Sequence, residues 1–197
     1  ITGHQMWSTV HAMDPYLVIT RLLRFGLDAR DFMDATILRA LVGQRLIGIV
    51  CEHCSVPFEG HERLLDDDIV QSVHALCERS NQSPAQIRLR PPAEIAKQCT
   101  HCNGTGVAGR KVVSEVVEVD DEFIAQLRGG TSVENARAWK RARPGHISML
   151  RHGIRRMFAG EADPREIVSV VGDLNAEVPD DQAISGDQEP QRDNSED

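Results

Sequence analysis

Two Cys-x-x-Cys pairs, separated by 44 residues, constrain this 197-residue chain more than any other feature. The first pair lies in "CEHC" and the second begins "CTHCNGTGVAGR"; together they comprise Cys51, Cys54, Cys99 and Cys102. Each pair brings two thiolates onto one knuckle, and two knuckles supply the tetrahedral sulfur set that Zn²⁺ prefers. We therefore predict one zinc ion held by the four cysteines. Free thiols or a redox-active pair are the alternatives.

The predicted zinc is structural, because four thiolates leave no open position for a catalytic water. His53 and His101 lie inside the knuckles and are superfluous as ligands. The metal is expected to close the ends of the excursion 55–98, which shows few apolar residues of its own, and to stabilise its local fold. The fifth cysteine, Cys77, recurs with apolar residues at helical spacing and is predicted to be a core thiol.

Composition indicates a soluble globular protein, with 41% hydrophobic and 26% charged residues and no apolar run of the ~20 residues that span a bilayer. Cysteines without a secretory signal indicate a reducing compartment. The net charge of −8 comes from residues 173–197, which carry nine acidic residues and one basic residue. This tail is predicted to be disordered, because it has almost no apolar residues to offset its ordering entropy.

Hydrophobic periodicity predicts an α/β core with an α-helical subdomain. The expected strands are "QMWSTV", "QRLIGIV" and "KVVSEVVEV"; the expected helices cover 14–25, 29–43, 65–79, 120–130, 131–142, 146–160 and 162–174. Predicted helix caps are Asp14, Asp120, Thr131 or Ser132, and Asp163, with Gly26 as a stop. Pro91 and Pro92 exclude a regular helix through their positions.

An ordered set of segments across residues 1–172 resembles the C-terminal part of the type II secretion and type IV pilus assembly ATPases. The opening "ITGHQMWSTVHAMD" is similar to the family's "TGHLVLSTLHTND", and "VITRLLRFGL" is similar to "AITRLLDMGV". The second cysteine pair, in "CTHCNGTGVAGRKVVSE", matches "CxxCxGTGYxGRxGIxE". The closing "ADPREIVSVV" is similar to "TSxEEVLRV".

The resemblance implies the C-terminal part of a RecA-like P-loop NTPase domain with an inserted zinc subdomain. Expected boundaries are 1–50 for the end of the RecA-like core, 51–110 for the four-cysteine subdomain, 111–172 for the last core strand and a helical C-terminal subdomain, and 173–197 for the acidic tail. The family implies a hexameric motor on the cytoplasmic face of the inner membrane. It hydrolyses ATP with Mg²⁺ and drives a pilus or pseudopilus through an inner-membrane platform protein.

In the family, the phosphate loop and the magnesium-binding acidic strand precede the "TGH" segment. No Gly-x-x-x-x-Gly-Lys-Ser/Thr motif occurs in these 197 residues. The chain also begins without Met, inside a predicted strand. We therefore expect that the sequence starts just downstream of the half that binds the nucleotide phosphates. We expect this portion alone to have no ATPase activity.

The resemblance carries nucleotide-site roles to six residues of this chain. His4 and His11 match the family's histidine box and are expected to sense the nucleotide, with Thr9 between them. Gln44, Arg45 and Arg110 also match family positions and either lie near the nucleotide or hold the fold through ion pairs. "HAMD" replaces "HTND" and "GRKVV" replaces "GRTGI", which is consistent with a divergent branch of the family.

The alternative is a stand-alone zinc-stabilised module that binds a protein or a nucleic acid without catalysis. "CTHCNGTG" fits the CxxCxGxG repeat of DnaJ-type cochaperones, but those carry four such repeats. Aromatic residues make up only 4% of the chain, which argues against direct nucleic-acid binding. The locally basic run "RAWKRARPGHISMLRHGIRR" is interpreted as a helix surface facing solvent, a ring neighbour or anionic lipid.

Overall fold

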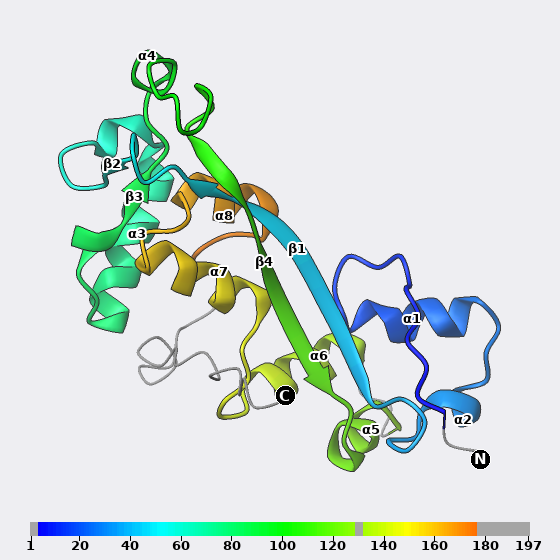
Figure 1. Ribbon diagram of the computed structural model, residues 1–197. Coiled ribbons are helices and arrows are strands. Elements are labelled where there is room, and N and C mark those ends of the chain that lie inside the picture. Colours follow the sequence, from blue (N-terminus) through cyan, green and yellow to red (C-terminus); the bar gives the residue numbers. More distant parts are fainter. Residues whose placement is uncertain (1–3, 129–131, 177–197) are drawn as a thin grey trace, which may run out of the picture. The chain divides into compact units, whose positions relative to one another are not determined.

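The computed structural model describes residues 4–128 and 132–176, which form a mixed α/β structure (Figure 1). Its strands are β1 (Ala40–Val50), β2 (Val56–Pro57), β3 (Arg88–Leu89) and β4 (Val107–Glu118). Its helices are α1 (Leu17–Arg24), α2 (Ala29–Phe32), α3 (Asp67–Ser80), α4 (Ala93–Ala96), α5 (Asp121–Arg128), α6 (Val133–Arg141), α7 (Met149–Phe158) and α8 (Pro164–Val170). None of the described helices is both long and apolar enough to cross a membrane.

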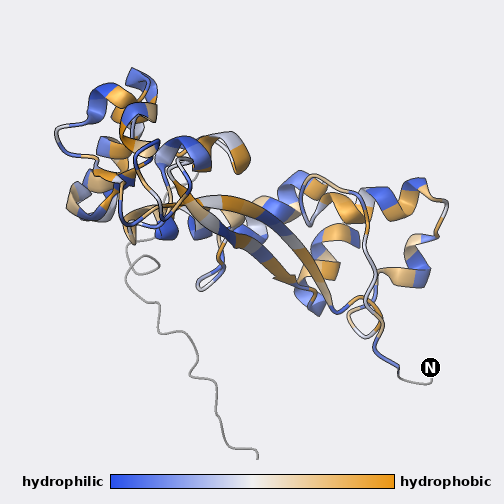
Figure 2. Ribbon diagram, turned by 45° about the horizontal axis from the view of Figure 1, so that its top comes forward, coloured by the Kyte–Doolittle hydropathy of each residue, from blue (hydrophilic) through white to orange (hydrophobic). Residues whose placement is uncertain are grey.

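The chain forms two compact units, and the paired strands β1 and β4 pass through both. The first unit contains the residues up to Gln44 together with Ser114–Met149; the second contains Arg45–Val113 together with the residues from Leu150 onward. Both strands were expected, and both are longer than the patterns "QRLIGIV" and "KVVSEVVEV" predicted. Figure 2 shows hydrophobic and hydrophilic residues along the two strands, as expected for a sheet with one buried face.

The core of the first unit forms where α1, α5 and α6 pack together. Its buried members are Tyr16, Ile19, Phe32, Met33, Leu41, Val117, Val119, Phe123, Ile124 and Ala136. The carboxylate of Asp14 accepts the amide of Leu17 at 3.0 Å and so caps the turn that leads into α1. The helix begins at Leu17, two residues later than a cap at Asp14 predicted. Gly26 follows the helix with φ of +85°, a backbone conformation that glycine adopts without steric cost.

The helix expected over 29–43 is wrong beyond its first turn. Helix α2 ends at Phe32, and the Asp34 carboxylate then accepts both the amide and the hydroxyl of Thr36, at 2.7 and 2.5 Å. Such local side-chain bonds favour turns over helix. From Ala40 the chain is already in β1 beside β4, so strand pairing overrides the helical pattern of the sequence.

The buried strand expected at "QMWSTV" is also wrong. This segment has no regular secondary structure, and Met6 and Trp7 are 89% and 82% exposed. A strand forms only where a neighbouring strand pairs with its backbone. No strand of the described residues pairs with this segment.

The second unit contains the excursion between the cysteine pairs, which has more of a core than its composition suggested. Its buried side chains include Phe58, Leu65, Val73, Leu76, Cys77, Ile87, Leu89 and Ala96, so Cys77 is a core thiol as predicted. Strands β2 and β3 pair antiparallel, with Val56 opposite Leu89. Helix α3 lies where the sequence predicted it, and Pro92 directly precedes the short α4.

Helices α5 to α8 confirm the pattern predicted for the C-terminal part. The carboxylate of Asp120 accepts the amide of Phe123 at 2.7 Å. The hydroxyl of Ser132 caps α6, and the carboxylate of Asp163 caps α8. The alternative cap Thr131 and residues 177–197 of the predicted disordered tail lie outside the described residues.

The basic run of the sequence, which was expected to face solvent, a ring neighbour or anionic lipid, also supplies ion pairs within the chain. The pairs are Arg137 with Asp14, Lys140 with Asp120, Arg141 with Glu115, Arg143 with Glu122, and Arg156 with Glu161. Lys140 is only 8% exposed. Four of these cations link parts of the fold that are at least twenty residues apart in sequence, whereas Arg156 pairs with a carboxylate in the turn that follows its own helix.

The most buried of these acceptors is Glu115 on β4, in the first unit. Arg141 donates to it twice, at 3.0 and 2.7 Å, and His146 Nε2 lies 3.0 Å from Oε1. Burial by itself raises the pKa of Glu115, but the hydrogen bonds from His146 and Arg141 outweigh it and lower the pKa to about 2. Burial and the nearby Glu115 raise the pKa of Tyr16, which keeps its hydroxyl protonated.

Candidate metal centre

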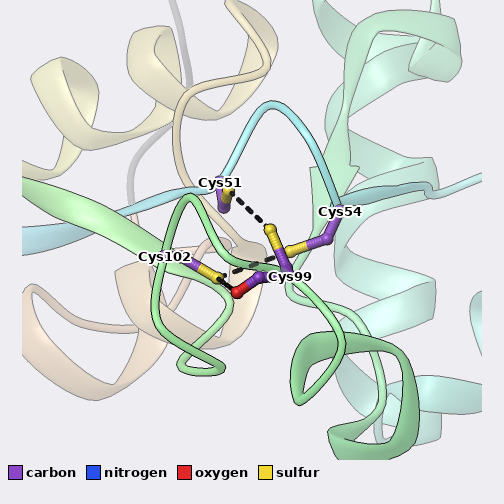
Figure 3. Close-up of side chains that lie close together, drawn as sticks. All are labelled: Cys51, Cys54, Cys99 and Cys102. Atoms are coloured by element: carbon purple, nitrogen blue, oxygen red, sulfur yellow. Dashed lines mark hydrogen bonds between the residues drawn. The ribbon is translucent and has the colours of Figure 1, made fainter.

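The four predicted cysteines come together in the second unit, where β1 ends and β4 begins (Figure 3). Their Sγ atoms all lie within 4.8 Å of one another. The closest contacts join the two knuckles: Cys51 to Cys99 at 3.9 Å, and Cys54 to Cys102 at 3.7 Å. All four are free of disulfides.

Backbone turns hold the two knuckles in this arrangement. Cys51 directly follows β1, and its amide donates to the carbonyl of Gly106 at 3.0 Å, which joins the two knuckles through their backbones. The amide of Gly106 donates to Cys102 Sγ at 3.2 Å. Gly106 has φ of +73°, and a Cβ there would lie 2.8 Å from Arg90 Cγ. Glycine is therefore required for the amide to reach the sulfur.

The four sulfurs fit a tetrahedral metal ion. A tetrahedron with metal–sulfur bonds of ~2.3 Å has sulfur–sulfur edges of about 3.8 Å. The contacts of 3.9 and 3.7 Å between the knuckles match that edge. All-sulfur tetrahedral sites suit Zn²⁺ or iron–sulfur chemistry, so the donor set narrows the class of metal.

The thiols differ in how readily they ionise. Burial by itself raises the pKa of Cys102, but the Gly106 amide and the hydrogen bonds from the other three cysteines lower it to about 6. Burial and hydrogen bonds to the other cysteines raise the pKa of Cys54. The amide of Gly106 therefore favours the thiolate form of Cys102, and a bound cation is needed to stabilise four adjacent thiolates.

Polar contacts that the sequence did not reveal anchor the excursion to α8. The Asp163 carboxylate accepts the backbone amide of Arg90 at 2.7 Å and pairs with Arg165. Arg165 also donates to the carbonyls of Leu64 and Arg90, at 3.2 and 3.0 Å. Glu166 accepts the amide of Gly48 on β1 at 2.7 Å. The cap motif at Asp163 was the one sequence signal that pointed to this network.

The six residues expected near a nucleotide lie outside the cysteine cluster. His4, Thr9 and His11 are exposed on the segment that precedes α1, and Gln44 is exposed on β1. Arg110 is exposed near the start of β4. Arg45 donates to the carbonyl of Val170 at the end of α8, a contact that supports the fold. Their roles at a nucleotide stay predictions.

Known proteins include relatives that align with most of this chain. The chain is 27% identical over 173 residues to the type II secretion system protein HxcR of Pseudomonas aeruginosa, covering 88% of this chain and 29% of that protein. It is 29% identical to the type IV pilus assembly ATPase PilB of Thermus thermophilus, covering 86% of this chain and 17% of that protein. It is also 29% identical to the type IV pilus assembly ATPase TfpB of Acinetobacter baylyi, covering 87% of this chain and 26% of that protein.

The chain therefore spans less than a third of the length of these relatives. The sequence profile of one protein family, described as "Type II/IV secretion system protein", matches residues 1–169. That match includes both cysteine knuckles, the strands β1 and β4 and almost all of α8. The chain belongs to the family of type II/IV secretion system proteins.

Proposed function

We propose that this chain is the C-terminal portion of a hexameric ATPase that powers type IV pilus assembly or type II protein secretion. The family match over residues 1–169, with relatives named as pilus assembly ATPases, carries the proposal. In this proposal the RecA-like core ends with residues 1–50, and the zinc subdomain covers residues 51–110. The last core strand and the helical subdomain lie in residues 111–172, and the acidic tail is residues 173–197. The complete motor works in the cytoplasm at the inner-membrane face, against a platform protein.

ATP hydrolysis needs residues beyond this chain, because these 197 residues contain no phosphate-loop motif to cradle the β- and γ-phosphates. We assign His4, Thr9 and His11 to the nucleotide site of the complete protein. Their exposure in this chain leaves them available to a nucleotide.

The metal of the four-cysteine site is proposed to be Zn²⁺ in a structural role. The sulfur–sulfur distances and the all-thiolate donor set support this assignment. When bound, the ion supplies the positive charge that stabilises four adjacent thiolates. The chain's own part is positional: Cys51 fixes the end of β1, Cys102 fixes the loop that leads into β4, and Gly106 donates its amide to the sulfur of Cys102.

The decisive experiment is ATP hydrolysis by the whole protein encoded by the gene that contains this segment. We expect Mg²⁺-dependent hydrolysis, and an approximately 10²-fold or greater loss of kcat when His4 or His11 is changed to Ala, the size typical of a positioned acid–base or polar group. Ser8→Ala is the matched control, because Ser8 is equally exposed between the two histidines. Absence of hydrolysis in the whole protein refutes the motor and leaves a zinc-stabilised binding module.

A further inference from the structure

His53 and His101 contact one another across the two cysteine knuckles. Their ring centroids lie 3.5 Å apart and the ring planes differ by only 9°, so the imidazoles are stacked at van der Waals distance. Each histidine directly precedes the second cysteine of its pair, Cys54 or Cys102. The two stacked rings therefore occupy equivalent positions in the two knuckles, one after β1 and the other in the loop before β4.

The stacked histidines are not part of the metal-binding group of the described residues. That group consists of the four cysteines, which already complete a tetrahedral set. Both histidines are exposed, whereas Cys51 and Cys102 are buried. An exposed aromatic contact that joins two ligand-bearing turns, without itself offering a ligand, needs an explanation other than coordination or core packing.

We propose that His53 and His101 form a clasp that holds the two knuckles together, so that the four sulfurs are pre-arranged for the metal. The inference rests on the proposed metal site and concerns residues that the site itself does not require. The excursion of 44 residues between the pairs must have its ends brought together before all four sulfurs can bind one ion. A contact that holds the ends together lowers that entropic cost at the binding step.

The clasp acts on affinity and on the rate of metal release. A stacked aromatic pair favours the closed arrangement by an amount equivalent to about two- to tenfold in an equilibrium constant. Because either ring alone has nothing to stack on, removal of one histidine abolishes the whole effect. The clasp therefore predicts that the two single variants and the double variant behave alike.

The test measures Zn²⁺ affinity and Zn²⁺ release in the whole protein by competition with a chromogenic chelator. We expect His53→Ala, His101→Ala and the double variant each to bind Zn²⁺ about two- to tenfold more weakly, without additivity. Glu52→Gln combined with Thr100→Ala is the matched control, because these exposed residues occupy the preceding position in each knuckle. This control is expected to match the unmodified protein.

Two further measurements separate a clasp from a ligand. Changing both histidines to Phe keeps two stackable rings without a metal-binding nitrogen, so it should restore Zn²⁺ affinity. The visible spectrum of the Co²⁺-loaded protein should stay that of a tetrathiolate site in every histidine variant. Additive losses, failure of the Phe pair to rescue, or a changed Co²⁺ spectrum each overturn the clasp.

The outcomes also distinguish this inference from the proposed metal site. A protein that binds one Zn²⁺ per chain, with unchanged affinity in the histidine variants, refutes the clasp and leaves the metal site in place. A protein that binds no metal at all refutes both.

Discussion

The cysteine cluster of the second unit and the buried Glu115 of the first unit accommodate acidic groups in different ways. Glu115 is fully buried at its side chain, and the chain surrounds it with its own donors, Arg141 and His146. The cysteine cluster brings four ionisable sulfurs within 4.8 Å of one another, but the backbone donor that reaches them is the amide of Gly106. One cluster carries its own positive charge, and the other has the all-sulfur donor set to which we assign a metal ion.

The two units therefore depend on their surroundings to different degrees. The Glu115 cluster forms whenever the chain folds, because every partner is a side chain or amide of the same unit. With the proposed Zn²⁺, the cysteine cluster ties the stability of its unit to metal supply, because thiolates must be neutralised when they are brought together.

Loss of the metal should have the largest effect and should be confined to the second unit. Changing Cys51 and Cys102 to Ser removes two of four ligands, one from each knuckle. Structural zinc sites contribute about 10–16 kcal/mol of apparent binding free energy, so we expect loss of bound Zn²⁺ and of amide protection over residues 51–106. Metal analysis and hydrogen exchange measure this, with Cys77→Ala as the control that keeps the metal. If residues 51–106 kept their amide protection after the metal was lost, the second unit would not depend on the metal.

Removal of the Glu115 carboxylate should destabilise the first unit and leave the metal in place. Glu115→Ala removes the buried carboxylate that Arg141 and His146 share, and breaking a buried ion pair costs about 3–5 kcal/mol. Urea unfolding followed by Trp139 fluorescence reports on this unit when Trp7, the other of the two tryptophans, is changed to Phe. A variant that lost Zn²⁺ together with stability would show that the two clusters are not independent.

Acid should weaken the Glu115 cluster over a defined range of pH. The pKa of Glu115 is lowered from 4.5 to about 2 in the folded chain, so the stabilisation is present above about pH 4.5 and is lost as the pH falls through 2. A shift of this size corresponds to roughly 3 kcal/mol. Unfolding of the Glu115→Gln variant should lack this dependence, and the difference from the unmodified protein isolates it from acid-induced metal loss. If the stability of the variant and of the unmodified protein fell in parallel with pH, Glu115 would not be the group that titrates.

Local sequence patterns predicted much of the secondary structure and the metal ligands. Helix caps at Asp120, Ser132 and Asp163 were readable because each acts on amides two or three residues away. The spacing within each cysteine pair was informative for the same reason. The predicted helix over 29–43 failed because residues 40–43 pair with a strand more than sixty residues later, a contact that no local pattern encodes.

The partners of charged residues were the least predictable part of the site and of the fold. Nothing in the sequence near Glu115 indicates that Arg141 and His146 approach it, and the basic run was assigned to the surface. The same holds for Asp163, whose role as a cap was predicted but whose contact with the Arg90 amide was not. Long charged side chains find partners across the fold, so their burial depends on how the elements pack.

Residue types at short, regular spacings were enough to predict the four cysteines of the metal site, the family and the helices whose caps are local. Three features follow instead from tertiary packing: β1 begins at Ala40, the excursion has its own core, and His53 stacks on His101. They differ from the first group in the sequence separation of the residues involved. Contacts between residues far apart in sequence are selected by packing and charge in the assembled fold, and a linear pattern does not carry that information.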